Sequence, residues 1–273
     1  MRRRYADTGL GQVHLRTLAP SGQASQPPLV CLHPIPYSGL YFTTIAPLLA
    51  DRRAVIAPDY PGYGGSDAVT DRPSIADYAA AMLQALAPRD GQAWGPVDLM
   101  GFHTGCLVAA EMALARPERV GRIVMIDAPV FEAAERAAMY DRATAQPAIT
   151  ETLDSLAPVW DTNVAKRLGS MPLMRAFALF VEQLRSGGRA AHGFHAAFTY
   201  SGENRLHRLT GSVLVIATRS GLLEPTRRAA RRIPGARLVE RLDIERAVLE
   251  EGAQAIAADV LGFLNQSDCA TNP

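Results

Sequence analysis

The sequence predicts an α/β protein built on a doubly wound, mostly parallel sheet with an inserted helical cap. Two observations predict the sheet: short apolar runs bounded by turn-forming residues recur along the chain, and helical segments separate them. A third observation predicts the cap, because one long interval contains no apolar run of this kind. The chain has 273 residues, which suffices for one sizeable core and a small inserted subdomain.

The first part of the chain predicts a hairpin followed by alternating strands and helices. Residues 4–7 and 12–18 flank a Gly9-Leu10-Gly11 turn and suggest an opening hairpin. Buried strands are expected at residues 29–32, 54–57, 97–100 and 122–126. Helices are expected at residues 74–86, where Ser74 is a good N-cap, and at residues 104–115.

The interval from residue 130 to residue 208 breaks this alternation. It is rich in Ala, Met and Arg and is punctuated by prolines, which predicts several short helices. Strands are expected again at 213–217 and 237–242, and a helix at 252–264. We therefore expect residues 1–129 and 209–273 to form the core. Residues 130–208 are expected to form a lid over the carboxyl ends of the strands, where ligands bind in such sheets.

Composition argues against several function classes. The formal net charge is +1 without long charged runs, so no nucleic-acid partner is expected. No apolar run could span a bilayer and no signal peptide is visible, so we expect no membrane association and a cytoplasmic location.

Cys31, Cys106 and Cys269 lack metal-ligand or redox spacing. No P-loop or dinucleotide-binding glycine motif occurs, so no cofactor is expected. The oligomeric state stays open.

Three motifs occur in order along the chain. They are HPIPYSG at residues 33–39, PDYPGYGGSD at residues 58–67 and GFHTG at residues 101–105. Together they resemble the α/β-hydrolase superfamily, and the third is similar to its G-x-nucleophile-x-G elbow in everything but the central residue. The resemblance covers essentially the whole chain. It implies the α/β-hydrolase fold with a cap.

The resemblance places histidine, His103, where the superfamily normally carries its nucleophile. The usual position of the catalytic acid falls near Gly221, which has no side chain. Glu224 lies farther along, and we expect it to be solvated in a loop. Some members carry the catalytic acid after the preceding strand, and Asp127 is at about that position. There it either faces the pocket, or caps a strand end or forms a local salt bridge.

The resemblance also places the superfamily's catalytic histidine near Glu245, with Asp243 as the other candidate for this position. No histidine occurs between residue 208 and the carboxyl terminus, so a Ser-His-Asp mechanism cannot operate here. Glu245 could equally be a solvated glutamate paired with Arg246. Which of the carboxylates of Glu245, Asp243 and Asp127 pairs with His103 stays open.

An imidazole at the elbow is suited to general-base catalysis. It titrates near neutral pH unless buried or paired, and a nearby carboxylate would favour its protonated form. The resemblance implies that the backbone N–H groups of Ile35 and Thr104 form an oxyanion hole. Because both donors are main-chain groups, a different side chain at the elbow leaves them in place. Such a site suits proton abstraction next to a carbonyl, or activation of water against an ester, lactone or thioester.

Five further residues are candidate substrate contacts: His33, Tyr37, Ser38, Tyr60 and His195. Each has an alternative role in packing. Two histidines and a carboxylate would make a metal set, but the superfamily's loop histidine usually packs inward, so no metal is expected at His33.

Two functions follow from these residues. The first is an enzyme that acts on a small hydrophobic carbonyl compound of the ester, lactone or β-keto type, with His103 as general base. The second is a catalytically inactive member that keeps the pocket and binds a small ligand. The apolar cap favours a small, largely hydrophobic partner in both cases.

Overall fold

A computed structural model describes residues 1–87, 95–145 and 150–266. Within these residues one sheet has eight strands in the order β1-β2-β4-β3-β5-β6-β7-β8. The strands are β1 (Arg2–Thr8), β2 (Gly11–Leu18), β3 (Leu29–Leu32), β4 (Val55–Pro58), β5 (Val97–Phe102), β6 (Val120–Ile126), β7 (Val213–Thr218) and β8 (Arg237–Arg241). β1 and β2 form the expected hairpin, β2 pairs antiparallel with β4, and all other pairs are parallel. The predicted fold class is confirmed.

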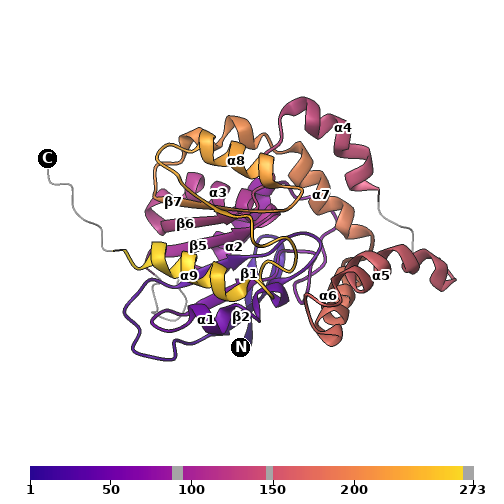
Figure 1. Cartoon of the computed structure of the whole chain (residues 1–273), viewed down its shortest axis with the longest axis horizontal. Helices are drawn as coiled ribbons and strands as arrows, with labels where there is room; N and C mark the ends of the chain where they lie inside the picture. The colour runs from indigo at the N-terminus through magenta and orange to yellow at the C-terminus, as the bar shows by residue number, and fades with distance from the viewer. Residues whose placement is uncertain (88–94, 146–149, 267–273) are drawn as a thin grey trace, which may run out of the picture.

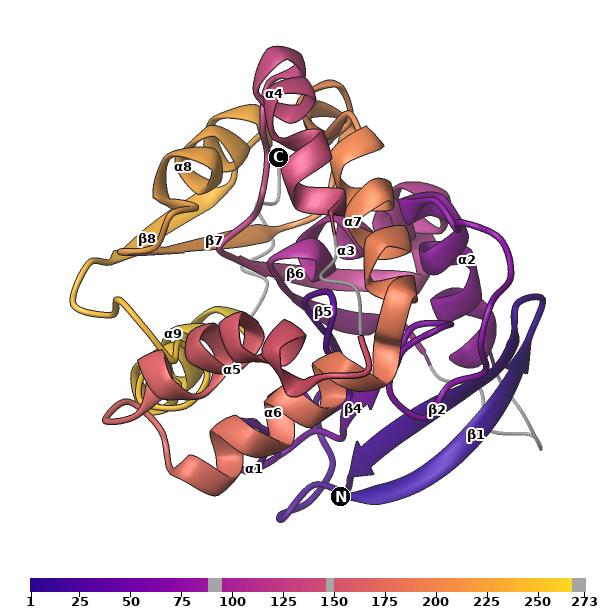
Figure 2. The ribbon, with the colours of Figure 1, turned by 90° about the vertical axis from the view of Figure 1, so that its right-hand side faces the viewer.

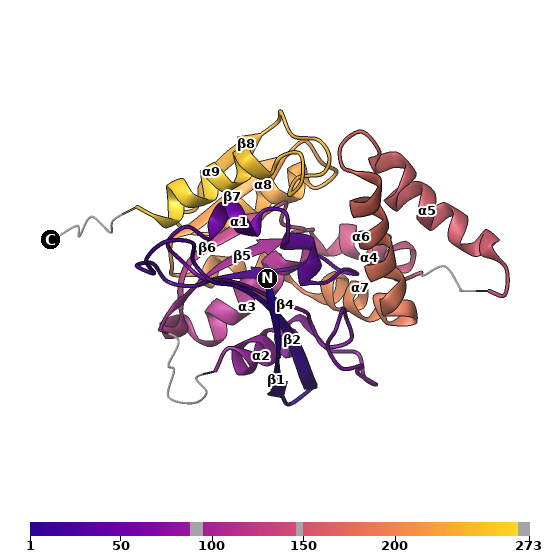
Figure 3. The same ribbon diagram turned by 90° about the horizontal axis from the view of Figure 1, so that it is seen from below.

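Helices cover both faces of the sheet. They are α1 (Ala46–Leu49), α2 (Ile75–Ala85), α3 (Thr104–Ala115), α4 (Ala133–Thr144), α5 (Ala157–Asn163), α6 (Leu173–Ser186), α7 (Ala190–Thr199), α8 (Leu223–Arg232) and α9 (Ala253–Leu264). α1 and α9 lie on one side of the sheet, and α2 and α3 on the other (Figure 3). The strands β3, β5 and β7 are buried along their whole length, as parallel strands covered on both faces must be.

Helix α8 is a departure from the sequence prediction. Glu224 was expected to lie in a loop, and instead it belongs to α8, which begins at Leu223. Pro225 is compatible with this because proline is tolerated in the first turn, where its missing N–H has no partner to lose. Glu224 therefore lies in a helix rather than a loop, where it pairs with Arg227 at 2.5 Å. Cys269 lies outside the described residues.

The interval between β6 and β7 contains the helices α4 to α7 and several 3-10 turns, among them Ala165–Arg167. Figure 1 shows these helices gathered at one end of the sheet, and Figure 2 shows them in front of it. They are tied to the loop after β4: the Tyr63 hydroxyl donates to the Arg189 carbonyl at 2.9 Å and accepts from the Gly193 N–H at 3.0 Å. The division into a core and a cap at the boundaries given above stays a prediction. No helix in the described part of the chain is long and apolar enough to cross a membrane.

Candidate active site

His103 and Asp127 follow directly after the neighbouring parallel strands β5 and β6. Phe102 is in register with Ile126, and Ile126 with Ile216. The ladder continues one residue further, because the His103 N–H donates to the Ile126 carbonyl and the Asp127 N–H donates to the Ile216 carbonyl, both at 3.0 Å. Both residues therefore stand at the carboxyl edge of the sheet, where ligands bind in α/β proteins.

A tight turn between β5 and α3 holds His103. Its backbone lies in a strained region, with φ 50° and ψ −119°, of the kind that clusters at functional sites. The flanking glycines permit the turn: a Cβ at Gly105 would lie 1.9 Å from the Leu32 carbonyl oxygen, and one at Gly101 would lie 2.5 Å from the Cys106 nitrogen. No side chain fits at either position, so the strand, the turn and the helix pack closely.

The carboxylate of Asp127 faces the His103 ring and is itself held firmly. Its Oδ2 lies 4.0 Å from His103 Nε2, which is ion-pair distance and too long for a hydrogen bond. Asp127 is fully buried. Its Oδ1 accepts from the Thr218 N–H at 2.9 Å, and its Oδ2 accepts from the Thr218 hydroxyl at 2.7 Å. The last residue of β7 thus orients the acid that follows β6.

The His103 ring is unprotonated at neutral pH. Desolvation by the surrounding protein lowers the pKa of His103 from 6.5 to about 4, against the opposing effect of Asp127, and the positive charge of Arg167 lowers it further. The side chain nevertheless exposes 39% of its surface, so water reaches the ring. The ring was expected to titrate near neutral pH unless buried or paired, and here desolvation outweighs the opposing effect of the carboxylate on the pKa of His103.

Three positions that the superfamily pattern singles out lie at the surface. Glu245 exposes 57% of its side chain and has Arg246 3.9 Å away. Asp243 and Gly221 are also exposed. Of the candidate carboxylates, Asp127 is the one that the structure brings to His103.

The two expected oxyanion donors lie next to this edge. Thr104 is the first residue of α3, so its N–H has no acceptor within the helix. Ile35 lies in the loop after β3, the strand that pairs with β5 on the side away from β6.

A family model described as "alpha/beta hydrolase fold" matches residues 27–205. The chain belongs to this family. Its 108-residue match to the pimeloyl-[acyl-carrier protein] methyl ester esterase of Aeromonas hydrophila subsp. hydrophila is 32% identical and covers 39% of this hydrolase-fold chain and 40% of that protein. The chain thus spans about two fifths of the length of this curated relative.

Solved hydrolase structures share the whole fold. A hydrolase from Pseudomonas aeruginosa PA01 superposes with a TM-score of 0.80 at 20% identity, covering 97% of this chain and 99% of that one. The enol-lactonase from Burkholderia xenovorans LB400 superposes with a TM-score of 0.76 at 20% identity, covering 96% and 100%. At these identities the likeness shows the fold.

Three of the predicted substrate contacts of this hydrolase-fold chain lie in the interior instead. His33 is fully buried: its Nε2 accepts from the Tyr60 N–H at 3.0 Å and its Nδ1 donates to the Pro34 carbonyl at 3.0 Å. Tyr60 is fully buried and its ring lies 4.0 Å from the His33 ring. Ser38 is fully buried and donates to Glu182. These side chains organise loops, and their role in binding substrate stays a prediction. Over the described ranges, no three metal-ligating side chains form a group.

The other two predicted contacts join the helical insertion. The Tyr37 hydroxyl donates to Asn163 Oδ1 at 2.5 Å and accepts from Arg167 Nη2 at 2.9 Å. His195, on α7, pairs through Nδ1 with the Tyr140 hydroxyl of α4 at 2.6 Å. Arg167 and Asn163 were not predicted, because no sequence motif distinguishes them from the other polar residues of the insertion.

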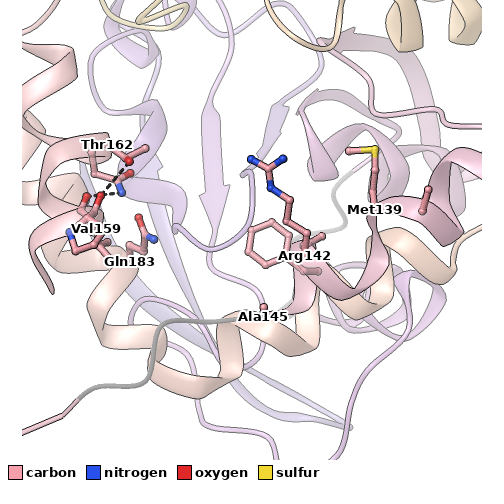
Figure 4. A pocket seen from close by; sticks show the side chains of 11 residues that line it. Met139, Arg142, Ala145, Val159, Thr162 and Gln183 are labelled. Carbon is pink, nitrogen blue, oxygen red and sulfur yellow. Dashed lines mark hydrogen bonds between the residues drawn. The ribbon is translucent and has the colours of Figure 1, made fainter. Parts of the chain in front are cut away.

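A cavity of about 530 Å³ lies among the helices of the insertion. In Figure 4, Val159, Thr162 and Gln183 lie on one side of it and Met139 and Arg142 on the other. Asn163 also lines it, so the cavity borders the hydrogen-bond network of Tyr37 and Arg167. His103 is not among its lining residues.

Proposed function

We propose that this chain is an enzyme that acts on a small carbonyl compound, with His103 as general base and Asp127 as its orienting carboxylate. The observation that carries the proposal is the pair itself: an imidazole open to water, with its Nε2 4.0 Å from a buried carboxylate oxygen. Burial lowers the pKa of this imidazole, which favours its unprotonated form. A base paired with an orienting group at the floor of a substrate site is a recognisable catalytic unit.

His103 takes up a proton in this scheme. For hydrolysis, a ring nitrogen removes a proton from water while the water oxygen forms a bond to the carbonyl carbon. The tetrahedral oxyanion then collapses, the bond to the leaving group breaks, and the imidazolium returns its proton to the leaving oxygen. Asp127 stabilises the imidazolium between these steps. Such help typically contributes about 10²–10⁴-fold to the rate, although the low pKa of His103 makes it a weak base.

The negative charge that develops on the carbonyl oxygen needs donors. The N–H of Thr104, at the N-terminus of α3, and the N–H of Ile35 supply them in this proposal. Helix N-termini favour negative charge, and donors aimed at a developing oxyanion contribute strongly to catalysis. Both are main-chain groups, so histidine at position 103 leaves them in place.

The same groups also suit abstraction of a proton from a carbon next to a carbonyl. His103 then takes the proton, and the same two N–H groups stabilise the enolate. Carbonyl substrates in general are supported by the relatives, whose printed names include a methyl ester esterase and an enol-lactonase. The reaction class is therefore a hydrolase, lyase or isomerase that works without a Ser-His-Asp triad.

The second candidate is a catalytically inactive binding protein. Gly221 offers no side chain and Glu245 lies at the surface, so the superfamily's acid and histidine have no replacement at their own positions. This observation favours a chain that kept the pocket and lost the chemistry.

A substrate screen distinguishes the enzyme from the inactive binding protein. Wild type, His103→Ala and the exposed control His207→Ala are assayed on 4-nitrophenyl esters, lactones and β-keto esters. The proposal predicts turnover that falls about 10²–10⁴-fold in His103→Ala and is unchanged in His207→Ala. A fluorophosphonate probe should leave position 103 unlabelled. Equal turnover by wild type and His103→Ala on every substrate contradicts the enzyme proposal and favours the binding protein.

A further inference from the structure

Arg167 is a half-buried arginine with an unused donor. Its Nη2 donates to the Tyr37 hydroxyl at 2.9 Å and lies 3.5 Å from Asn163 Oδ1. Its Nη1 is buried and has no hydrogen-bond partner. Throughout residues 1–87, 95–145 and 150–266, no carboxylate lies within ion-pair distance of this guanidinium.

Three well-buried arginines of the chain are each paired with a carboxylate. Arg53 contacts Asp98 at 2.7 Å, Arg136 contacts Glu203 at 2.5 Å, and Arg175 contacts Glu250 at 2.6 Å. Taking a cation out of water is costly unless a counter-charge and hydrogen bonds compensate it. Among the described residues Arg167 lacks such a partner, as do the half-buried Arg119 and Arg189, whose guanidinium groups bond to main-chain carbonyls. Arg167 differs from these two in that its buried Nη1 has no hydrogen-bond partner, so this donor is available to an external anion.

Arg167 lies close enough to His103 for its positive charge to lower the pKa of that ring. Its guanidinium lies 5.6 Å from the centre of the Tyr37 ring. Adjacent ring centres then follow at 5.1 Å from Tyr37 to Tyr41, 5.4 Å from Tyr41 to Phe102 and 4.1 Å from Phe102 to His103. The buried rings of Tyr37, Tyr41 and Phe102 therefore pack in a continuous row between the cation and the imidazole.

We propose that Arg167 Nη1 binds a carboxylate of the substrate on which His103 acts. The substrate class is then a small carbonyl compound that carries a carboxylate away from the reacting carbonyl, such as a half-ester or a keto acid. The neighbouring Lys166 pairs with Asp161 at 2.7 Å, so Arg167 offers one uncompensated positive charge, which matches a carboxylate better than a phosphate dianion. Tyr37 and Asn163 hold the guanidinium in place. This inference rests on the proposed function, and it replaces a purely hydrophobic substrate with an anionic one.

A matched pair of substrates tests it. Mono-4-nitrophenyl glutarate and 4-nitrophenyl pentanoate have acyl chains of equal length, and only the first carries a carboxylate. In Arg167→Met the ratio of kcat/KM for the half-ester to kcat/KM for the neutral ester should fall about 10- to 100-fold, the range of a hydrogen bond to a charged group. Any effect of Arg167 on the pKa of His103 changes turnover of both substrates alike, so it cancels in this ratio. Arg246→Met, which removes an exposed arginine near the same turn, should leave the ratio unchanged. An unchanged ratio in Arg167→Met overturns the inference.

Binding without turnover separates this inference from the proposed function. Glutarate, its dimethyl ester and inorganic phosphate are titrated calorimetrically into His103→Ala and into His103→Ala combined with Arg167→Met or Arg167→Lys. Glutarate should bind His103→Ala, bind more weakly when Arg167→Lys is added, and fail to bind when Arg167→Met is added. The dimethyl ester and phosphate should bind none of the three proteins. If glutarate binds all three proteins equally, or if phosphate binds more tightly, the carboxylate subsite is wrong. If Arg167 controls glutarate binding while His103→Ala turns over as wild type does, the subsite stands and the catalytic proposal fails.

Discussion

His103 and Asp127 occupy equivalent points on two adjacent strands, and both have left-handed backbones, with φ 50° and φ 49°. Each residue directly follows its strand and is held there by a main-chain bond to the next strand. Such conformations cost on the order of 1–3 kcal/mol each in non-glycine residues. In this arrangement Nε2 lies 4.0 Å from Oδ2, so the carboxylate is placed to act on the imidazole.

Thr218 should stabilise the protein through Asp127. In Thr218→Val the backbone N–H still bonds to Oδ1, but the hydroxyl donor to Oδ2 is lost. Hydrogen bonds to charged groups contribute about 1.5–3 kcal/mol, so the free energy of unfolding should fall by roughly that amount. Urea denaturation measures it. A loss below about 0.5 kcal/mol, the level of an unremarkable surface change, argues against a tightly held carboxylate.

The elbow glycines should tolerate no side chain. In Gly105→Ala the new Cβ meets the Leu32 carbonyl oxygen at 1.9 Å, and the clash has to exceed the gain in helix propensity of about 1 kcal/mol. We expect a clear loss of stability or failure to fold, measured by thermal unfolding. Gly221→Ala is the control, because no atom lies within 4 Å of its new Cβ. Equal melting temperatures for the two variants would mean that the turn is looser than described.

His33 should make the fold sensitive to acid. Burial lowers the pKa of His33 to about 4 in the folded chain, against 6.5 when unfolded. The unfolded state binds more protons between these values, so the stabilising contribution is complete above pH 6.5 and is lost as the pH falls toward 4. The whole contribution is about 3 kcal/mol. His33→Gln keeps an acceptor for the Tyr60 N–H and should show a shallower fall of unfolding free energy across this window. A fall as steep as that of wild type would contradict the assignment.

Glu245 and Asp127 should differ in their importance for activity. Glu245→Gln changes an exposed side chain and should alter kcat/KM less than twofold. Asp127→Asn removes the charge that stabilises the imidazolium and should lower kcat/KM at least tenfold. Steady-state kinetics on one substrate compares them, and the reverse order of effects would return the role to Glu245.

The strands were predictable because buried parallel strands are short apolar runs between turn residues. The run at residues 29–32 matches β3, and α3 begins and ends as expected. The place of Glu224 in α8 was missed. Pro225 lies in the first turn of this helix, a position that permits proline.

The site was only partly predictable, because strand order decides which side chains meet. His103 is marked by its glycines, but Asp127 was one of three candidates until the register of β5, β6 and β7 was known. The burial of the loop residues His33, Ser38 and Tyr60 was not predictable, since sequence does not tell which side of a loop faces inward. Arg167 was missed because its unusual feature is a missing counter-charge, which exists only in three dimensions.

The role of the His103–Asp127 pair is decided by the pH dependence of kcat/KM, measured for wild type and Asp127→Asn with an active substrate from the screen. We expect an acidic limb near pH 4 in wild type, where His103 becomes protonated. In Asp127→Asn the limb should move to lower pH, because Asp127 raises the pKa of His103. A limb that stays in place without Asp127, or full activity in His103→Ala at every pH, would contradict it.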